Sequence, residues 1–226
     1  MDWTALRLSL QLGACTVLLL LPMALFAGRA LGTRRFRGKS LVEALLAVPL
    51  VLPPTVLGYY LLVSLGGQSP LGQWFERLTG QPLVFHFSGL VVASLVANIP
   101  FAVQPIQRAF ETIPQEVRDA AACCGLSSWQ TLWRIELPLA WPGLLTATVL
   151  TFAHTLGEFG VVLMVGGSIP GQTQTISIAI YDRVQALDLA AAGTMSLLLL
   201  LFSVAVLALA GTLGRRFGER YGRQRG

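Results

Sequence analysis

The segment SLQLGACTVLLLLPMALFAG, residues 9–28, decides the fold class because it contains no charged side chain. A helix of about 20 residues rises about 30 Å, which is enough to cross the hydrocarbon core of a membrane. Further uncharged runs occupy residues 44–75, 78–107, 137–157, 159–181 and 189–214. Only 12% of the residues are charged and 54% are hydrophobic, whereas a soluble domain has about 25% charged residues. The sequence therefore predicts an all-α polytopic membrane protein and excludes a large soluble domain.

Five transmembrane helices are predicted, within a single domain that covers residues 1–226. Their approximate bounds are 9–28, 41–65, 88–106, 139–165 and 189–213. The run 159–181 is not counted as a further span, because turn-forming and polar residues interrupt it between 166 and 175. We expect it to form the end of the fourth span and a loop. Pro49, Pro53 and Pro54 remove backbone donors from the second span and are expected to bend or break it.

The basic residues indicate how the spans are oriented. With five spans, the segments 29–40 and 107–138 and the tail from 214 lie on one side, and they hold 13 of the 16 Lys and Arg residues. Positive charge concentrates on the cytoplasmic side of membrane proteins. We therefore expect an extracytoplasmic N-terminus and a cytoplasmic C-terminus. The first span is expected to be retained, since it lacks the cationic leader of a signal peptide.

The charge pattern and the cysteines disfavour several classes of partner and cofactor. The chain has a net charge of +5, and its basic residues lie at the ends of the apolar runs, where they indicate the orientation in the membrane. No nucleic-acid partner is therefore expected. Cys15, Cys123 and Cys124 do not have the spacing of a disulfide framework or of a metal site. The tripeptide GKS at residues 38–40 lacks the earlier glycine and the strand of a phosphate-binding loop. We expect no cofactor, metal or nucleotide in this chain.

The longest segment on the basic side, residues 107–138, is predicted to contain two short helices. Both begin where a hydroxyl residue is followed three positions later by an amide residue, which is the spacing of a capping box. Gly125 lies between the helices, where a left-handed residue would end the first one. Pro138 is predicted to stop the second helix just before the fourth span. The two predicted capping boxes are Thr112 with Gln115 and Ser127 with Gln130.

The same segment carries a motif at fixed spacing. It reads Asp119-Ala120-Ala121, then Gly125, then Ile135-Glu136-Leu137-Pro138. This resembles the cytoplasmic signature of ATP-binding-cassette (ABC) importer permeases, Glu-Ala-Ala, Gly and Ile-x-Leu-Pro, with Asp119 in place of the usual Glu. The resemblance implies a type I permease fold, in which a coupling helix docks in a groove of a separate ATPase subunit. The coupling residues that it implies are Asp119, Ala120, Ala121, Gly125, Ile135, Leu137 and Pro138.

Other segments are similar to molybdate and sulfate permeases. They are FRGKS at 36–40, VLPPTV at 51–56, GEFG at 157–160, and IPGQTQT at 169–175 followed by AIY at 179–181. The last pair looks like the molybdate branch, which we favour over sulfate or thiosulfate. The resemblance implies a bacterial inner-membrane homodimer with the pore on its two-fold axis. It also implies two cassette ATPase subunits and an extracytoplasmic oxyanion-binding protein as partners.

Residues inside the spans are candidates for the pore or its gate. A carboxylate at Glu158 would repel a divalent oxyanion and needs a partner in the membrane, for which His154, one turn earlier, is the nearest candidate in sequence. We therefore expect a structural and gating role for Glu158. Weak anion contacts are expected from Thr55, Asn98 and the 157–160 backbone. The pore or gate candidates are Pro53, Pro54, Thr55, Asn98, Gly157, Glu158, Phe159 and Gly160.

Two other functions are weighed against an importer permease. An intramembrane enzyme is disfavoured, because His154 and Glu158 have no further ligand at helical spacing and no nucleophile nearby. A secondary transporter with Glu158 as its proton carrier is the other alternative. Such a transporter has no use for the capped loop, so we expect a transport subunit whose ATP is hydrolysed by another polypeptide.

Overall fold

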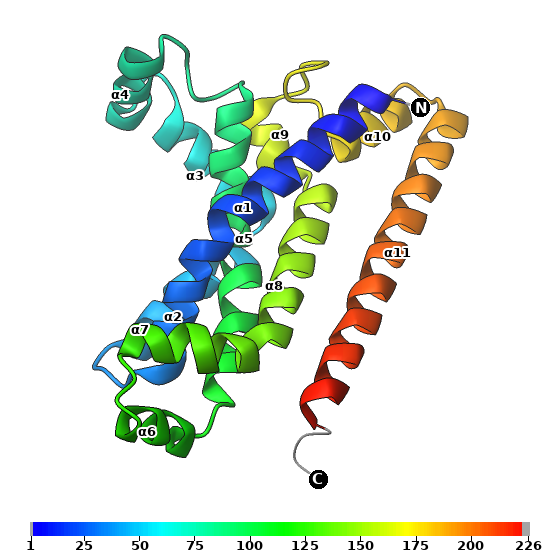
Figure 1. Ribbon diagram of the computed structural model, residues 1–226. Helices are drawn as coiled ribbons and strands as arrows, with labels where there is room; N and C mark the ends of the chain where they lie inside the picture. Colours follow the sequence, from blue (N-terminus) through cyan, green and yellow to red (C-terminus); the bar gives the residue numbers. More distant parts are fainter. Residues whose placement is uncertain (1, 223–226) are drawn as a thin grey trace.

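The computed structural model describes residues 2–222, and all the regular structure in that range is helical (Figure 1). The long helices are α1 (Trp3–Thr33), α5 (Phe87–Glu111), α8 (Leu137–Gly157) and α11 (Leu189–Gly222). The shorter helices are α2 (Lys39–Val51), α3 (Pro54–Leu65), α4 (Pro70–Thr79), α6 (Gln115–Cys123), α7 (Ser128–Thr131), α9 (Gly160–Gly166) and α10 (Ile176–Gln185). A π-helical turn, Leu132–Glu136, joins α7 to α8.

Four helical stretches are long and apolar enough to cross a membrane. They are α1, α5, the continuous stretch Ser128–Gly157 and the part of α11 at Leu189–Ala208. Helices α2 and α3 make a fifth if they count as one broken span, because they are bent by 106° where Leu52 and Pro53 separate them. The predicted all-helical membrane fold with about five spans is confirmed.

Helices α1, α5 and α8 form the central bundle. Glycines let their backbones approach closely, as transmembrane helices commonly do. A Cβ atom at Gly28 of α1 would lie 2.7 Å from Ile106 of α5, and one at Gly143 of α8 would lie 2.8 Å from the carbonyl oxygen of Pro105. The core between the three helices includes Leu20, Ala24, Ala102, Ile106, Phe110, Leu144 and Ala147. Helix α11 packs on α8 and α10, and only 11% of its apolar stretch is buried, so most of that stretch faces outward.

The helix bounds differ from the predicted spans in three ways. Helices α1, α5 and α11 run past the predicted ends of their spans. The predicted span 139–165 is divided, because α8 ends at Gly157 and α9 begins at Gly160, with Glu158 in an extended conformation between them. Helices α4 and α10 lie where the sequence predicts no helix. For α4 a local signal was present, since the Ser69 hydroxyl caps the helix by accepting from Gly72 N–H at 2.9 Å and proline follows at the first helical position.

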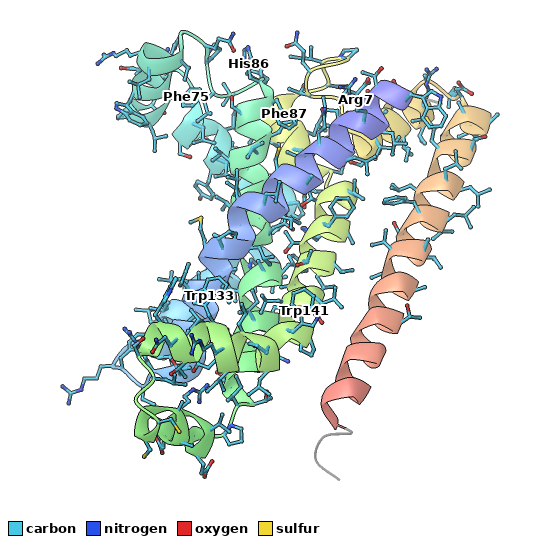
Figure 2. The ribbon with its side chains drawn as sticks, viewed as in Figure 1. Arg7, Phe75, His86, Phe87, Trp133 and Trp141 are labelled. Atoms are coloured by element: carbon cyan, nitrogen blue, oxygen red, sulfur yellow. The ribbon has the colours of Figure 1, made fainter. Side chains whose placement is uncertain are left out.

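The two ends of the bundle hold different segments of the chain. Helix α1 runs from an end shared with α4 and α10 to an end shared with α6 and α7, and α11 finishes toward that second end (Figure 1). Arg7 lies at the first end and Trp133 at the second (Figure 2). We call the second end the loop end; it holds the basic segments 29–40 and 107–138. Arg223 and Arg225 of the basic tail lie outside the described residues.

Candidate functional site

At the loop end, α6, α7 and the π-helical turn form a bracket, here defined as residues 115–136. Gly125 has φ +74°, which confirms the predicted left-handed end of the first short helix. Its N–H donates to the Ala122 carbonyl at 2.9 Å, and Leu126 N–H donates to the Ala121 carbonyl at 3.1 Å. A Cβ atom at Gly125 would meet nothing within 4 Å, so only the backbone conformation requires glycine there.

One of the two predicted capping boxes is present. Ser127 accepts from the Gln130 N–H, and the Gln130 side chain accepts from the Ser127 N–H, so α7 begins as predicted. The prediction of a capping box at Thr112 is wrong. Thr112 ends α5 with αR dihedral angles, its hydroxyl donates back to the Ala109 carbonyl, and Pro114 precedes the first residue of α6. The proline starts α6 without a side-chain cap.

The prediction that Pro138 stops the second helix is also wrong. The helix continues from Ser128 to Gly157 and contains Pro138 near the start of α8. Proline lacks the N–H that an α-helix uses at each position, and its ring clashes with the carbonyl four residues earlier. The π-helical turn at Leu132–Glu136 accommodates the proline within a continuous helix. In this turn the Leu137 N–H donates to the Leu132 carbonyl, five residues back. The bracket is therefore joined rigidly to the long helix α8.

A buried ion cluster fixes the bracket to the bundle. The carboxylate of Glu136 is 1% exposed and accepts from Arg29 Nε at 2.6 Å and from Arg118 Nε at 2.7 Å. Arg29 comes from α1 and also donates to Ser128 at the start of α7. Arg118 comes from α6 and donates as well to the carbonyls of Ile113 and Phe110. One carboxylate thus ties α1, α6 and the start of α8 together.

The motif residues of the bracket divide between buried and exposed positions. Ala121 is 3% exposed, whereas Asp119 and Ala120 are exposed, and Asp119 accepts from Gln115 Nε2 at 2.9 Å. Ile135, Leu137 and Pro138 are half-buried. Trp129 and Trp133 are 58% and 46% exposed and contact each other edge to face. The bracket therefore presents an aromatic and polar surface outward.

The second group of candidate residues lies where two helix breaks meet. The break between α2 and α3 contains Pro53, and the break between α8 and α9 contains Glu158 and Phe159. A Cβ atom at Gly160 would lie 2.7 Å from Pro54 Cβ, so glycine is needed for this approach. Thr55 and Gly157 are exposed beside the contact. The predicted proline break in the second span and the break that divides the predicted span 139–165 thus form one junction.

A polar chain through His154 joins two of the candidate residues, Asn98 and Glu158, inside the bundle. Asn98 is fully buried, and its amide N–H donates to the Ser94 carbonyl, so its oxygen is directed to His154 Nδ1 at 3.1 Å. That oxygen can only accept, so the contact is a hydrogen bond in the forms of the ring that carry a proton on Nδ1. His154 Nε2 lies 3.6 Å from one oxygen of Glu158, and the other oxygen accepts from the Val161 N–H at 3.1 Å. The structure thus gives Glu158 the histidine partner suggested by its spacing.

Helix α10 contacts both residues of the α8–α9 break, Glu158 and Phe159. Phe159 packs on Tyr181 of α10, and the Ser177 hydroxyl donates to the Glu158 carbonyl at 2.7 Å. Helix α10 thereby holds the α8–α9 break in place.

The sequence reasoning missed the Arg29–Glu136–Arg118 cluster. Glu136 stands at the unspecified position of the Ile-x-Leu-Pro motif, and its partners lie 107 and 18 residues away in sequence. One local signal was present, since Glu136 is a carboxylate between the apolar residues Ile135 and Leu137 at the start of a span. Arg29 and Arg118 entered the prediction only through the orientation of the spans.

Comparison with known proteins decides the family. The model of the family "Binding-protein-dependent transport system inner membrane component" matches residues 21–219. The chain belongs to this family. It is therefore a multi-pass inner-membrane permease and a transport component rather than an enzyme.

Two curated relatives show which branch of the family this chain resembles. The permease is 46% identical over 206 residues to the molybdenum transport system permease protein ModB of Azotobacter vinelandii, covering 91% of each chain. It is 32% identical over 216 residues to the sulfate transport system permease protein CysW of Synechococcus elongatus, covering 96% of this chain and 75% of the relative. These matches place the permease in the molybdate and sulfate branch, as its motifs suggested.

A solved structure shows the same fold. A chain of a bacterial alginate ABC transporter, solved in complex with an alginate pentasaccharide-bound periplasmic protein, superposes with a TM-score of 0.75. The match covers 94% of this chain and 78% of the other, at 16% sequence identity. The likeness supports the ABC importer permease fold and, at that identity, nothing about the substrate.

Proposed function

We propose that this permease carries molybdate into the cytoplasm as the membrane subunit of an ABC importer. The observation that carries the proposal is the 46% identity to a molybdenum transport permease over 91% of both chains. Transport would proceed by alternating access, with ATP hydrolysed by a separate subunit. The sulfate relative, at 32% identity, makes sulfate or thiosulfate the second candidate substrate.

The partners of this proposal are a second copy of the permease, two ATPase subunits and an extracytoplasmic oxyanion-binding protein. Support for a second copy comes from α2 and α3, whose apolar side chains are exposed in the single chain. Val51 is 82% exposed, Leu45 61% and Tyr60 63%. A broken span with such a surface needs cover from lipid or from another chain, and a homodimer would supply it around a central pore.

Coupling would run through the bracket to the junction of the helix breaks. An ATPase that moves α6 pulls on Arg118, and Glu136 passes the displacement to α1 and to the start of α8. Helix α8 has 21 residues, so it spans about 30 Å and ends at the α8–α9 break. A rigid helix tied at one end to the bracket and at the other to the break is a physical lever between the two sites.

The anion path is proposed to pass the junction of the two breaks. Thr55 and Gly157 are exposed there and offer a hydroxyl and backbone groups. We assign Glu158 and Asn98 to holding the junction, since both already bond inside the bundle. Weak contacts with the Thr55 hydroxyl and the Gly157 backbone would let an anion bind and leave. We also propose that the loop end is cytoplasmic, as the basic segments 29–40 and 107–138 suggest.

The test is molybdate uptake by bacteria in which this permease is the sole molybdate permease, expressed with its ATPase and binding protein. Radioactive molybdate should accumulate, and a large excess of sulfate or thiosulfate should compete weakly. Strong competition by sulfate together with sulfate accumulation would instead assign the sulfate function. Loss of uptake on adding an uncoupler while cellular ATP stays high would favour the proton-coupled alternative.

A further inference from the structure

A cavity of about 500 Å³ lies between α2, α5 and α8, on the loop-end side of the junction of the helix breaks. Its walls run from Leu50, Phe101 and Leu150 near the breaks to Pro142 and Arg108 toward the loop end. Phe101 and Arg108 are seven residues apart on α5, which is about 10 Å along a helix. Phe101 also stacks on the His154 ring, with centroids 4.0 Å apart. The cavity therefore adjoins the polar chain of His154 and Glu158 through a single aromatic ring.

The polar groups of this cavity suit an anion. Gln104 and Arg108 are one turn apart and lie on one face of α5, so both side chains line the same space. The Thr146 hydroxyl also lines it, but its proton is donated to the Pro142 carbonyl at 2.8 Å. The donors left for a ligand are the guanidinium of Arg108 and the amide of Gln104. A guanidinium presents parallel N–H groups that match the oxygens of a tetrahedral oxyanion.

The nearby carboxylates are already engaged. A neighbouring cavity of about 350 Å³ shares Gln104 and Arg108 and is also lined by Glu43 and Glu111. Lys39 Nζ lies 3.6 Å from Glu43 and 3.5 Å from Glu111, and Gln107 Nε2 donates to both. Within residues 2–222, Arg108 makes no ion pair within 4.0 Å. Lys39 thus balances one of the two carboxylate charges and Gln107 bonds to both acids, while the Arg108 guanidinium pairs with neither.

We propose that Arg108 and Gln104 form a binding site for a tetrahedral oxyanion dianion in this cavity, on the loop-end side of the helix breaks. The proposal rests on the proposed function, since it places a second stop on the path of the carried anion. An anion that passes the junction would leave the weak contacts at Thr55 and Gly157 for the charged donor at Arg108, which lies about 10 Å along α5 from Phe101. The Phe101 ring, which lines the cavity and stacks on His154, would lie between the two stops.

The experiment is equilibrium dialysis of the permease with its ATPase in lipid nanodiscs, without ATP and without binding protein. The probes are radioactive molybdate and radioactive sulfate at constant ionic strength. The variants are Arg108→Gln, Arg108→Lys and Gln104→Ala, with Arg77→Gln on α4 as a matched loss of one arginine at the opposite end. Co-purification of the ATPase and the melting temperature show whether each variant is folded.

Saturable binding is expected in the wild type and in Arg77→Gln. Arg108→Gln should weaken the binding about tenfold or more, because it removes a charged hydrogen-bond donor. Arg108→Lys should retain part of the affinity, since lysine keeps the charge but not the fork of donors. Gln104→Ala should weaken it by a smaller factor. Saturable binding that is equal in Arg108→Gln and the wild type, or absent in a wild-type complex that imports molybdate, would overturn the site and leave the proposed function intact. Failure of that complex to import molybdate with binding protein and ATP would count against the proposed function itself.

Discussion

Replacing Glu136 by glutamine tests whether the buried ion cluster holds the bracket. The substitution keeps the shape of the side chain but removes the charge shared by Arg29 and Arg118, whose hydrogen bonds to it are 2.6 and 2.7 Å long. It also turns one acceptor atom into a donor that faces a guanidinium group. Removing one partner of a buried ion pair costs about 3–5 kcal/mol.

The lower end of that range applies here. The arginine side chains are 22% and 16% exposed, and both keep bonds to backbone carbonyls. We therefore expect a loss of about 3 kcal/mol in the free energy that holds α6 against α1 and α8. That corresponds to a rise on the order of a hundredfold in the population with α6 detached.

Hydrogen exchange and coupling assays measure this directly. In Glu136→Gln, amides of residues 115–126 should exchange faster by up to that factor, and molybdate taken up per ATP hydrolysed should fall. Glu76→Gln on α4 removes an exposed carboxylate at the opposite end and should change neither quantity. The double variant Glu136→Gln with Arg118→Gln should lose less than the sum of the single losses, because the two residues share one interaction. Unchanged exchange and unchanged uptake per ATP in Glu136→Gln would refute the role of the cluster.

Three further outcomes are expected. A fluorescent protein fused to the C-terminus should be bright and an alkaline phosphatase fused there inactive, because we propose that the basic segments, and with them that end, lie in the cytoplasm; the reverse pattern would contradict the five-span orientation. Gly125→Val should abolish uptake at normal membrane levels because valine resists φ +74°, whereas Gly125→Asn, which tolerates that conformation, should keep much of it; equal uptake in both variants would show that the turn does not aim the bracket. Glu158→Gln should retain substantial uptake, since its amide can still accept from Val161 N–H and donate to His154 Nε2, while Glu158→Ala removes the partner of the Val161 N–H and of His154 Nε2; a glutamine variant as inactive as the alanine variant would mean that the charge is required.

The apolar spans were predictable because their signal is local. Residues 9–28 and 189–213 contain no interrupting charge, and both lie inside long helices. The left-handed turn at Gly125 and the cap at Ser127 were also local, since each depends on residues within four positions. Thr112 shows the limit of such signals. It fits a capping box by spacing, but α5 continues through Glu111 and takes its hydroxyl for a bond within that helix.

The candidate site was predicted only in part because its assembly depends on distant segments. The proline break at Pro53 and the glycines around Glu158 were each visible in the sequence. The contact between Gly160 and Pro54 depends on tertiary packing and was not. Pro138 carries a helix-stopping signal that a five-residue π-helical turn overrides. The partners of Glu136 and the cavity beside Arg108 require three helices each, so no periodicity in one segment encodes them.

The most direct test of ATP-driven molybdate import uses proteoliposomes made from purified permease and ATPase. ATP and Mg²⁺ are sealed inside, and radioactive molybdate with its binding protein is added outside. The account predicts accumulation that requires ATP hydrolysis and the binding protein, and that is lost with a non-hydrolysable ATP analogue. Accumulation that persists with the analogue, or that follows an imposed pH gradient without ATP, would contradict it.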